Sequence, residues 1–508
     1  MIFMKKLTTR LLSLVLLGAF IPSFVLAETW DLGKGDITVT ATETSQTVSQ
    51  VNGETKDDPD PVITSSGKTE NTVTINAETN ATANVTLENV NIDTGTRGGA
   101  AITTSGEGNV NIELNGTNTV QSGNTHAGVE KKDNGTLTIT DEDKDGSLTA
   151  TGGNYGAGIG GGYEGSGSNI AIEGGKVKAI GGTHGAGIGG GFGGSGSNIA
   201  IEGGKVEASS VGGGAGIGGG SLGSGSNITI SGGEVTAQGG VGGAGIGGGQ
   251  GGSGSNITIS DGKVTATGAG AGAGIGGGYE GSGKSITIEG GEVTAQGDAG
   301  GAGIGGGISG TGSDVTISGD AQVKVQGGTT GRDWHKGAAI GNGGTPTTDG
   351  NEVSPNTSDL KVGGFIQIYE PGKNINTDTP DKTIEGQKGD HSWNAGEVTA
   401  ETVPESKAAA YWVSDSEGQS IPYQAQQKDG VLTVTVQADT ASLRGTTGSL
   451  RQLEAQGVAE IRFVTKGAQS AFTLSDLLTS GTGSFTLTHD GDKITFTLEN
   501  TDISGILK

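Results

Sequence analysis

The string Ala157-Gly-Ile-Gly-Gly-Gly162 decides the fold, because it returns at a constant interval. Its isoleucine recurs every 29 residues, at Ile159, Ile188, Ile217, Ile246, Ile275 and Ile304. Altered copies surround this block, centred on Ile102, Val129 and Ile340. A period of about 20–50 residues is the sequence signature of solenoids and other repeat architectures. We therefore expect a stack of similar coils.

Each 29-residue unit contains three apolar pairs whose members are two residues apart. In the first unit these pairs are Ala157/Ile159, Ile170/Ile172 and Val177/Ala179, and glycine-rich segments separate them. A spacing of two is the periodicity of a β-strand, and glycine-rich segments favour turns. Three short strands and three turns make one triangular coil. The predicted fold is all-β: a right-handed parallel β-helix with 29-residue coils, followed by a small C-terminal α+β domain.

Glycine accounts for 106 of the 508 residues, whereas the chain has only 9 prolines and no cysteine. This composition excludes a collagen-like helix, disulfide bonds and thiolate metal sites. Glycine suits the sharp turns of a solenoid, since it adopts positive φ and allows close backbone approach at low cost. The position before the Ile-x-Ile strand is polar, and we expect its members to form a ladder between coils: Asn169, Asn198, Asn227, Asn256, Ser285 and Asp314.

The N-terminus has the pattern of a secretory signal peptide over residues 1–27, with a basic start, an apolar run and a small-residue cleavage site. We expect a secreted protein that either is released or stays associated with the cell surface. The formal charge of −25 disfavours binding to nucleic acid or insertion into an anionic membrane. The predicted parts are an N-terminal cap (28–62), the β-helix (63–345), a cap or linker (346–404) and the C-terminal domain (405–508), with a helix over Leu450 to Gln456.

Three segments of this pattern, Asn84–Ile92, Gly108–Asn118 and Thr149–Gly162, resemble the carbohydrate-binding β-helix family of clostridial secreted proteins. The characterised members of that family bind polygalacturonate. The resemblance covers about residues 60–345. It implies a right-handed β-helix like that of pectate lyases, calcium sites, and binding of a polysaccharide without cleavage.

An acidic loop is the candidate metal site. Asp141, Asp143 and Asp145 alternate with other residues and precede Gly146, and three such carboxylates suit calcium. The EF-hand pattern does not continue, because its twelfth position is Gly152. The alternative is a solvated acidic turn.

Aromatic and basic side chains are the candidate carbohydrate-binding residues. Tyr163, Phe192 and Tyr279 follow the repeat isoleucine by four positions and either pack on sugar faces or cover a turn of the core. At a turn, we expect Tyr163 and Phe192 to stack on adjacent coils. Arg332, Trp334 and Lys336 form a mixed patch that either binds an anionic sugar or seals the last coil.

The predicted function is therefore non-catalytic binding of a polysaccharide, and the resemblance favours an acidic polysaccharide bound with the help of calcium. The alternative is a structural or adhesive cell-surface solenoid without a sugar ligand. Polysaccharide lyases on this fold need an acidic calcium site beside a Lys or Arg base, and no such cluster is apparent in the regular coils.

Overall fold

The computed structural model describes residues 27 to 508 with several gaps. The signal peptide predicted over residues 1–27 therefore lies almost entirely outside the described residues. The gaps are residues 52, 54, 133, 330–334, 346, 358–359, 361–362, 387–410, 416–420, 422, 429, 448–449, 451–452, 455–456, 482–483, 492 and 499–500.

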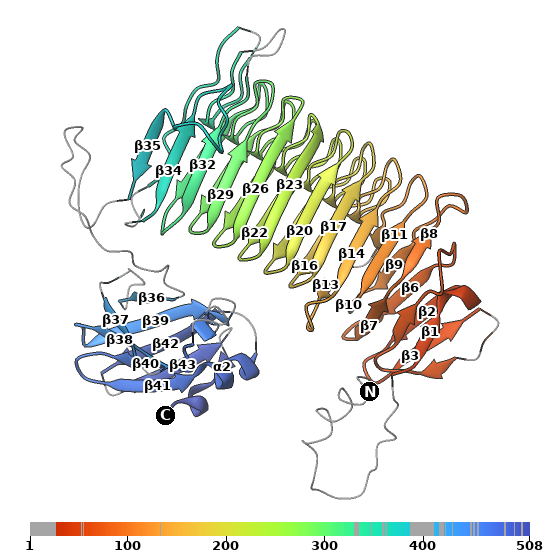
Figure 1. Ribbon diagram of the computed structural model, residues 1–508, viewed down its shortest axis with the longest axis horizontal. Coiled ribbons are helices and arrows are strands. Elements are labelled where there is room, and N and C mark those ends of the chain that lie inside the picture. The colour runs from red at the N-terminus through yellow and green to blue at the C-terminus, as the bar shows by residue number, and fades with distance from the viewer. Residues whose placement is uncertain are drawn as a thin grey trace, which may run out of the picture.

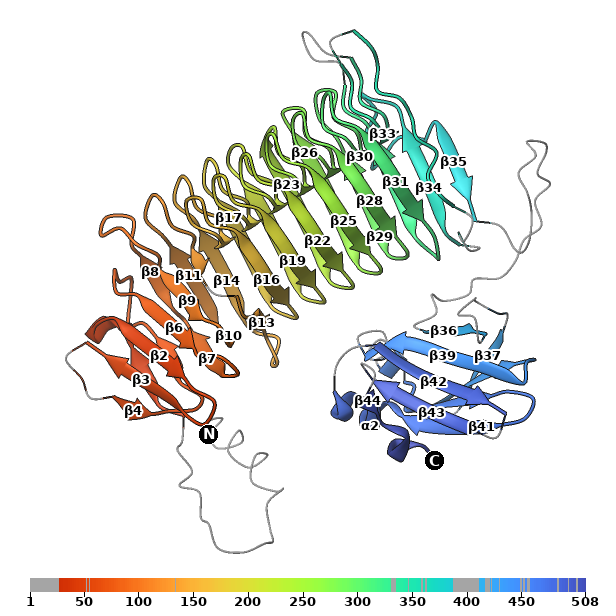
Figure 2. The same ribbon diagram turned by 180° about the vertical axis from the view of Figure 1, so that it is seen from behind.

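The described residues from Thr29 to Glu385 form the predicted parallel β-helix, whose coils stack in chain order along one axis (Figures 1 and 2). Each regular coil contributes one strand to each of three sheets, which we name A, B and C. The chain passes from a short strand in B to a strand in A and then to a strand in C. Consecutive coils are 29 residues apart and pair in parallel, so that Ile188 lies beside Ile159 and Ile217. The predicted fold class is confirmed.

Sheet A has eleven strands: β1 (Thr29–Asp31), β5 (Val62–Thr64), β7 (Thr82–Glu88), β10 (Asn109–Asn115), β13 (Leu137–Thr140), β16 (Gly167–Ile172), β19 (Gly196–Ile201), β22 (Gly225–Ile230), β25 (Gly254–Ile259), β28 (Gly283–Ile288) and β31 (Gly312–Ile317). Sheet C also has eleven: β8 (Asn91–Asp93), β11 (Thr117–Gln121), β14 (Ser147–Thr151), β17 (Lys176–Gly181), β20 (Lys205–Ser210), β23 (Glu234–Val241), β26 (Lys263–Ala269), β29 (Glu292–Gln296), β32 (Gln322–Gln326), β34 (Phe365–Tyr369) and β35 (Lys382–Glu385).

Sheet B has thirteen strands, most of them very short: β4 (Lys56–Asp57), β3 (Gln46–Gln50), β2 (Ile37–Ala41), β6 (Val73–Ala77), β9 (Ile102–Gly106), β12 (Val129–Lys131), β15 (Ile159–Gly160), β18 (Ile188–Gly189), β21 (Ile217–Gly218), β24 (Ile246–Gly247), β27 (Ile275–Gly276), β30 (Ile304–Gly305) and β33 (Ile340–Gly341). A single turn of 3-10 helix, η1 (Leu32–Lys34), follows β1.

The core of the solenoid is built from the predicted apolar pairs. Ile159, Ile170, Ile172, Val177 and Ala179 are all at most 1% exposed. Since each buried isoleucine packs against equivalents in the coils before and after it, small aliphatic side chains are enough to fill the interior. This explains how a chain with 4% aromatic residues forms a continuous core.

Glycine is required where sheet B turns toward sheet A. Gly160, Gly189 and Gly218 have φ near +130°, a conformation that side-chain-bearing residues rarely adopt. A Cβ atom on Gly218 would also collide with the carbonyl oxygen of Gly247 in the next coil. Both the backbone angle and the close stacking therefore exclude larger residues from this position.

The predicted polar ladder is present in sheet A. The Nδ2 group of Asn198 donates to Oδ1 of Asn169 at 2.8 Å, and Asn227 and Asn256 continue the series at 3.0 Å. All six members of the row have φ between 51° and 56°. Asparagine tolerates this conformation better than most residues. The row therefore serves the fold by linking coils.

The ends of the solenoid differ from the predicted boundaries. Parallel pairing already begins at β1 and β2, inside the segment expected to be a cap, and it continues beyond residue 345 to β34. Antiparallel strands then close both ends: β3 and β4 continue sheet B at the N-terminal end, and β35 pairs with β34 at the other. Such strands protect sheet edges from pairing with other chains.

The C-terminal domain contains two small sheets, the helix α2 (Leu474–Ser480) and a partly described helical segment around Leu450. One sheet is β36 (Tyr411–Ser414), β39 (Thr440–Thr446), β42 (Ser484–Asp490), β43 (Lys493–Leu498) and β44 (Thr501–Asp502); the other is β37 (Tyr423–Lys428), β38 (Val431–Val436), β40 (Glu460–Val464) and β41 (Gln469–Thr473). The helix α2 (Leu474–Ser480) and the 3-10 turn η2 (Ser504–Ile506) complete it.

The helix predicted over Leu450 to Gln456 falls partly outside the described residues, although Leu450, Leu453 and Glu454 within it are helical. The helix α2 was not predicted from the sequence. Its N-cap is Thr473, whose hydroxyl accepts from the backbone N–H of Asp476 at 3.2 Å. In the described part of the chain, no helix has the length and hydrophobicity needed to cross a bilayer.

Candidate carbohydrate platform and acidic hollow

An exposed aromatic pair lies on the loops that lead from sheet B to sheet A. The rings of Tyr163 and Phe192 stack with their centroids 5.7 Å apart and their planes 15° from parallel. The predicted stacking of these two residues on adjacent coils is therefore confirmed. Tyr163 is 47% exposed, and Phe192 is half-buried. The pair does not simply cover the core, because one ring is largely open to solvent.

Two further rings reach the same place from the loops that lead from sheet C to sheet B. Tyr155 contacts Tyr163 and Phe192 edge-on, with centroids 5.5 and 5.9 Å away. His184 stacks on Tyr155 at 5.2 Å and meets Phe192 edge-on at 5.3 Å. We call Tyr155, Tyr163, His184 and Phe192 the aromatic platform. Tyr155 and His184 were not predicted as binding residues, because they come from the other loop of the coil.

Backbone hydrogen bonds hold the two loops of the platform together. The N–H of Phe192 donates to the carbonyl of Tyr155 at 2.9 Å, and the N–H of Ser221 donates to that of His184 at 2.8 Å. The platform is thus positioned by the same inter-coil bonding that builds the solenoid. Preorganised aromatic surfaces bind ligands without a large ordering cost.

A buried carboxylate supports the first coil of the platform. Oε2 of Glu130 accepts from the N–H of Ala127 at 3.0 Å and lies 2.7 Å from Nδ1 of His126, while Oε1 pairs with Lys132 at 2.7 Å. The same loop contacts the platform directly, since the N–H of Tyr163 donates to the carbonyl of Thr125 at 2.7 Å. Glu130 is 2% exposed and fully engaged, so we assign it a structural role.

Two of the tyrosines that follow a repeat isoleucine by four positions, Tyr163 and Tyr279, each have a glutamate beside them. A hydrogen bond from Tyr163 to Glu164 and the negative charge of that carboxylate raise the pKa of Tyr163. Burial is the main cause of the raised pKa of Tyr279, and the neighbouring Glu280 adds to it. Both tyrosines therefore stay protonated at neutral pH and present hydroxyl and carboxylate groups side by side.

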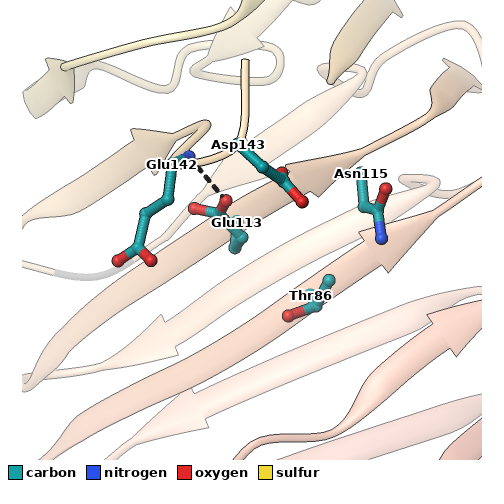
Figure 3. A pocket seen from close by; sticks show the side chains of 5 residues that line it. All are labelled: Thr86, Glu113, Asn115, Glu142 and Asp143. Atoms are coloured by element: carbon teal, nitrogen blue, oxygen red, sulfur yellow. Dashed lines mark hydrogen bonds between the residues drawn. The ribbon is translucent and has the colours of Figure 1, made fainter. Parts of the chain in front are cut away.

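An acidic hollow lies at the turn that joins sheet A to sheet C, away from the loops that flank sheet B. It has a volume of about 390 Å³ and is lined by Thr86, Glu113, Asn115, Glu142 and Asp143 (Figure 3). Ligand oxygens of Glu113, Asp141 and Asp143 lie within 4.8 Å of one another. Oxygen donors of this kind suit a hard cation such as calcium.

Hydrogen bonds hold the glutamate of this hollow in place. Oε2 of Glu113 accepts from the Thr140 hydroxyl at 2.5 Å, and Oε1 accepts from the N–H of Glu142 at 2.7 Å. Oδ1 of Asp141 accepts from the N–H of Gly146 at 3.1 Å, which fixes the turn. Each carboxylate oxygen has a further lone pair, so these bonds leave room for a cation.

The repeat matches a known family model, described as "Beta helix repeat". The matched segments are residues 144–163, 170–192, 199–221, 228–250, 257–279 and 286–308. The coils over residues 144–308 are therefore similar to beta helix repeats. No curated protein and no solved structure matches the chain.

The match explains which site residues belong to the repeat itself. Tyr163, Phe192 and Tyr279 each lie within a matched beta helix repeat, whereas Glu113 and Asp141 precede the first one. The platform is therefore a local variation of a regular coil position, and the acidic hollow belongs to the irregular coils before it.

The structure brings together only part of the predicted metal set. Asp141 and Asp143 converge, but Asp145 is exposed and is not part of the group; Glu113, from the preceding coil of the solenoid, takes its place. Glu113 pairs in register with Thr140, which immediately precedes Asp141. The length of one coil could have identified Glu113 from the sequence, because residues 27 or 28 positions apart lie side by side in neighbouring coils at this point.

The six predicted carbohydrate-binding residues do not form one site. Tyr279 lies four coils beyond Tyr163, and Lys336 precedes the strand of the sixth coil beyond it. The ammonium group of Lys336 pairs with Glu370 at 3.2 Å, at the C-terminal end of the solenoid. Arg332 and Trp334 lie outside the described residues.

Proposed function

We propose that this protein is a secreted, non-catalytic binder of a polysaccharide, and that the aromatic platform is its main binding surface. The observation that carries the proposal is the exposed stack of Tyr163 on Phe192, which two further rings extend. Large exposed aromatic patches are uncommon on soluble proteins and mark binding sites. The resemblance of the sequence to a carbohydrate-binding β-helix family points to the same class of ligand.

The proposed lack of catalysis follows from the chemistry of the platform. Glu130, which supports the platform, is buried and paired with His126 and Lys132, so this carboxylate is not available to attack or protonate a glycosidic bond. Export rests on the signal-peptide pattern of residues 1–27. Incubation of the purified protein with candidate polysaccharides should therefore release no reducing or unsaturated ends.

The platform can be tested by a double substitution. Tyr163→Ala with Phe192→Ala should lower the affinity for a bound glycan at least about tenfold, because central aromatic residues dominate most interfaces. The measurement is retardation in gels that contain individual polysaccharides, after a glycan array has identified binders. Thr258→Ala, on the outward face of sheet A, is the matched control and should leave retardation unchanged. Equal retardation of the wild type, the double variant and the control would exclude the platform as the binding surface.

We also propose that calcium binds in the acidic hollow and assists binding of an acidic glycan there. Calcium should then raise the melting temperature of the wild-type protein, since a ligand that binds only the folded state stabilises it. Asp141→Asn and Glu113→Gln should abolish this increase. Asp145→Asn should keep it, because Asp145 lies outside the group. A calcium response that depended on Asp145 and not on Glu113 would contradict the assignment.

A structural or adhesive solenoid without a sugar ligand is the second candidate. The regular inter-coil bonding favours it, since the fold alone accounts for most of the repeat. Absence of binding to every glycan of a broad array, with and without calcium, would favour this candidate over the first.

A further inference from the structure

The aromatic platform is one end of a longer row of side chains. The position of Tyr163 is occupied in successive coils by Tyr163, Phe192, Ser221, Gln250, Tyr279 and Ile308. The next position forms a parallel row: Glu164, Gly193, Leu222, Gly251, Glu280 and Ser309. Backbone bonds connect the two rows from coil to coil, for example from the N–H of Glu164 to the carbonyl of Phe192 at 2.8 Å. The two rows therefore form one continuous strip along the solenoid.

Exposed apolar side chains gather along this strip. Besides Tyr163, the most exposed large apolar residues of the described repeat are Val211, Leu222 and Val241, which are 63% to 67% exposed. Val211 and Leu222 lie on loops that flank sheet B, and Val241 is the last residue of β23, directly before such a loop; all three fall between Tyr163 and Tyr279 in the chain. Exposed apolar side chains that gather on one surface are typical of a binding surface for a partner with apolar faces.

The part of the strip between Tyr163 and Tyr279 is negatively charged at both ends. Glu164 lies beside Tyr163, and Glu280 lies beside Tyr279. Four coils separate the two glutamates, which is about 19 Å at the usual spacing between paired strands. The loops that flank sheet B from β15 to β27 contain no lysine or arginine. Lys132, in the coil before Tyr163, is engaged with Glu130. A polyanionic chain on this strip would thus meet two carboxylates and no opposing cation in these loops.

We infer that the strip binds a linear, uncharged polysaccharide segment that runs along the solenoid from Tyr163 to Tyr279. This inference rests on the proposed function and specifies its ligand class. The rings and the exposed aliphatic side chains contact the apolar faces of the sugars. Glu164 and Glu280 accept hydrogen bonds from sugar hydroxyls. Such bonds are stronger with a charged carboxylate than with a neutral acceptor. An acidic glycan instead requires the calcium hollow, which lies on another edge of the coil.

The experiment compares neutral and acidic polymers in the presence of EDTA, which removes calcium from the hollow. A β-glucan, a xylan and a mannan serve as neutral probes, and polygalacturonate is the acidic one. At least one neutral polymer should be retained more strongly than polygalacturonate. Glu164→Gln with Glu280→Gln should weaken that retention about tenfold, because the double variant loses one or two charge-assisted hydrogen bonds to the sugar.

The direction of the ligand is tested with oligosaccharides of the retained polymer. Tyr279→Ala should weaken binding of long oligomers and leave binding of a disaccharide unchanged, whereas Tyr163→Ala should weaken both. Thermal unfolding verifies that each variant is folded. Stronger retention of polygalacturonate than of any neutral polymer in EDTA would overturn the ligand class while leaving the carbohydrate proposal intact. Absence of binding to all the polymers would refute the proposed function itself.

Discussion

Replacement of Gly218 by alanine is expected to destabilise the solenoid by at least about 3 kcal/mol, the sum of a strained backbone and an overpacked site. Gly218 has φ of +129°, and its added Cβ would collide with the carbonyl oxygen of Gly247. That oxygen cannot move away freely, since it accepts from the N–H of Gly219 at 2.9 Å. Denaturant unfolding followed by circular dichroism gives the change in free energy.

Gly67 provides the matched control for this substitution. It is exposed, its φ lies outside the positive region, and an added Cβ has no neighbour within 4 Å. Gly67→Ala should therefore change the free energy of unfolding by less than about 0.5 kcal/mol. Similar losses in the two variants would mean that the stacked glycines of sheet B tolerate side chains, contrary to the geometry.

Ile228→Ala is expected to cost about 2–5 kcal/mol, the range for cavity-forming substitutions in a packed core. Ile228 is fully buried and pairs with Ile199 and Ile257 in the neighbouring coils. A cavity there weakens contacts on both sides, because a solenoid is stabilised mainly by contacts between nearest neighbours. Limited proteolysis should show new cleavage near this coil before the ends of the solenoid are digested.

Ile228→Val, which removes a single methylene, is the graded control and should cost about 0.5–1.5 kcal/mol. Equal losses for valine and alanine would mean that the loss does not grow with the volume removed, contrary to a cavity effect. Since unfolding of a long repeat array need not be two-state, proteolysis and spectroscopy should be compared before a free energy is assigned.

The two candidate sites differ in how far the sequence could define them. Tyr163 and Phe192 occupy the same position of adjacent units, so the period alone predicted that they stack. Tyr155 and His184 reach them from a different loop, and their side-chain directions follow from the shape of the coil. The repeat phase fixes which residues share a row, but it does not show which rows face each other.

The acidic hollow shows the same limit more sharply. Asp141 and Asp143 formed a recognisable local motif, yet the third carboxylate is Glu113 and not Asp145. A calcium-loop pattern assumes that a single segment folds around the ion. In a solenoid, the nearest neighbours of a turn are the coils before and after it, so ligands come from residues one coil apart.

The sequence by itself determined the solenoid, because a 29-residue period with paired apolar residues and glycine turns has few other ways to bury its hydrophobic side chains. It also determined the asparagine ladder, since identical positions in identical coils must stack. Only the tertiary structure decided where the solenoid ends, since β34 continues a sheet after a long irregular segment. It likewise decided the membership of the sites, because contacts between different rows depend on how the turns direct their side chains and not on the repeat alone.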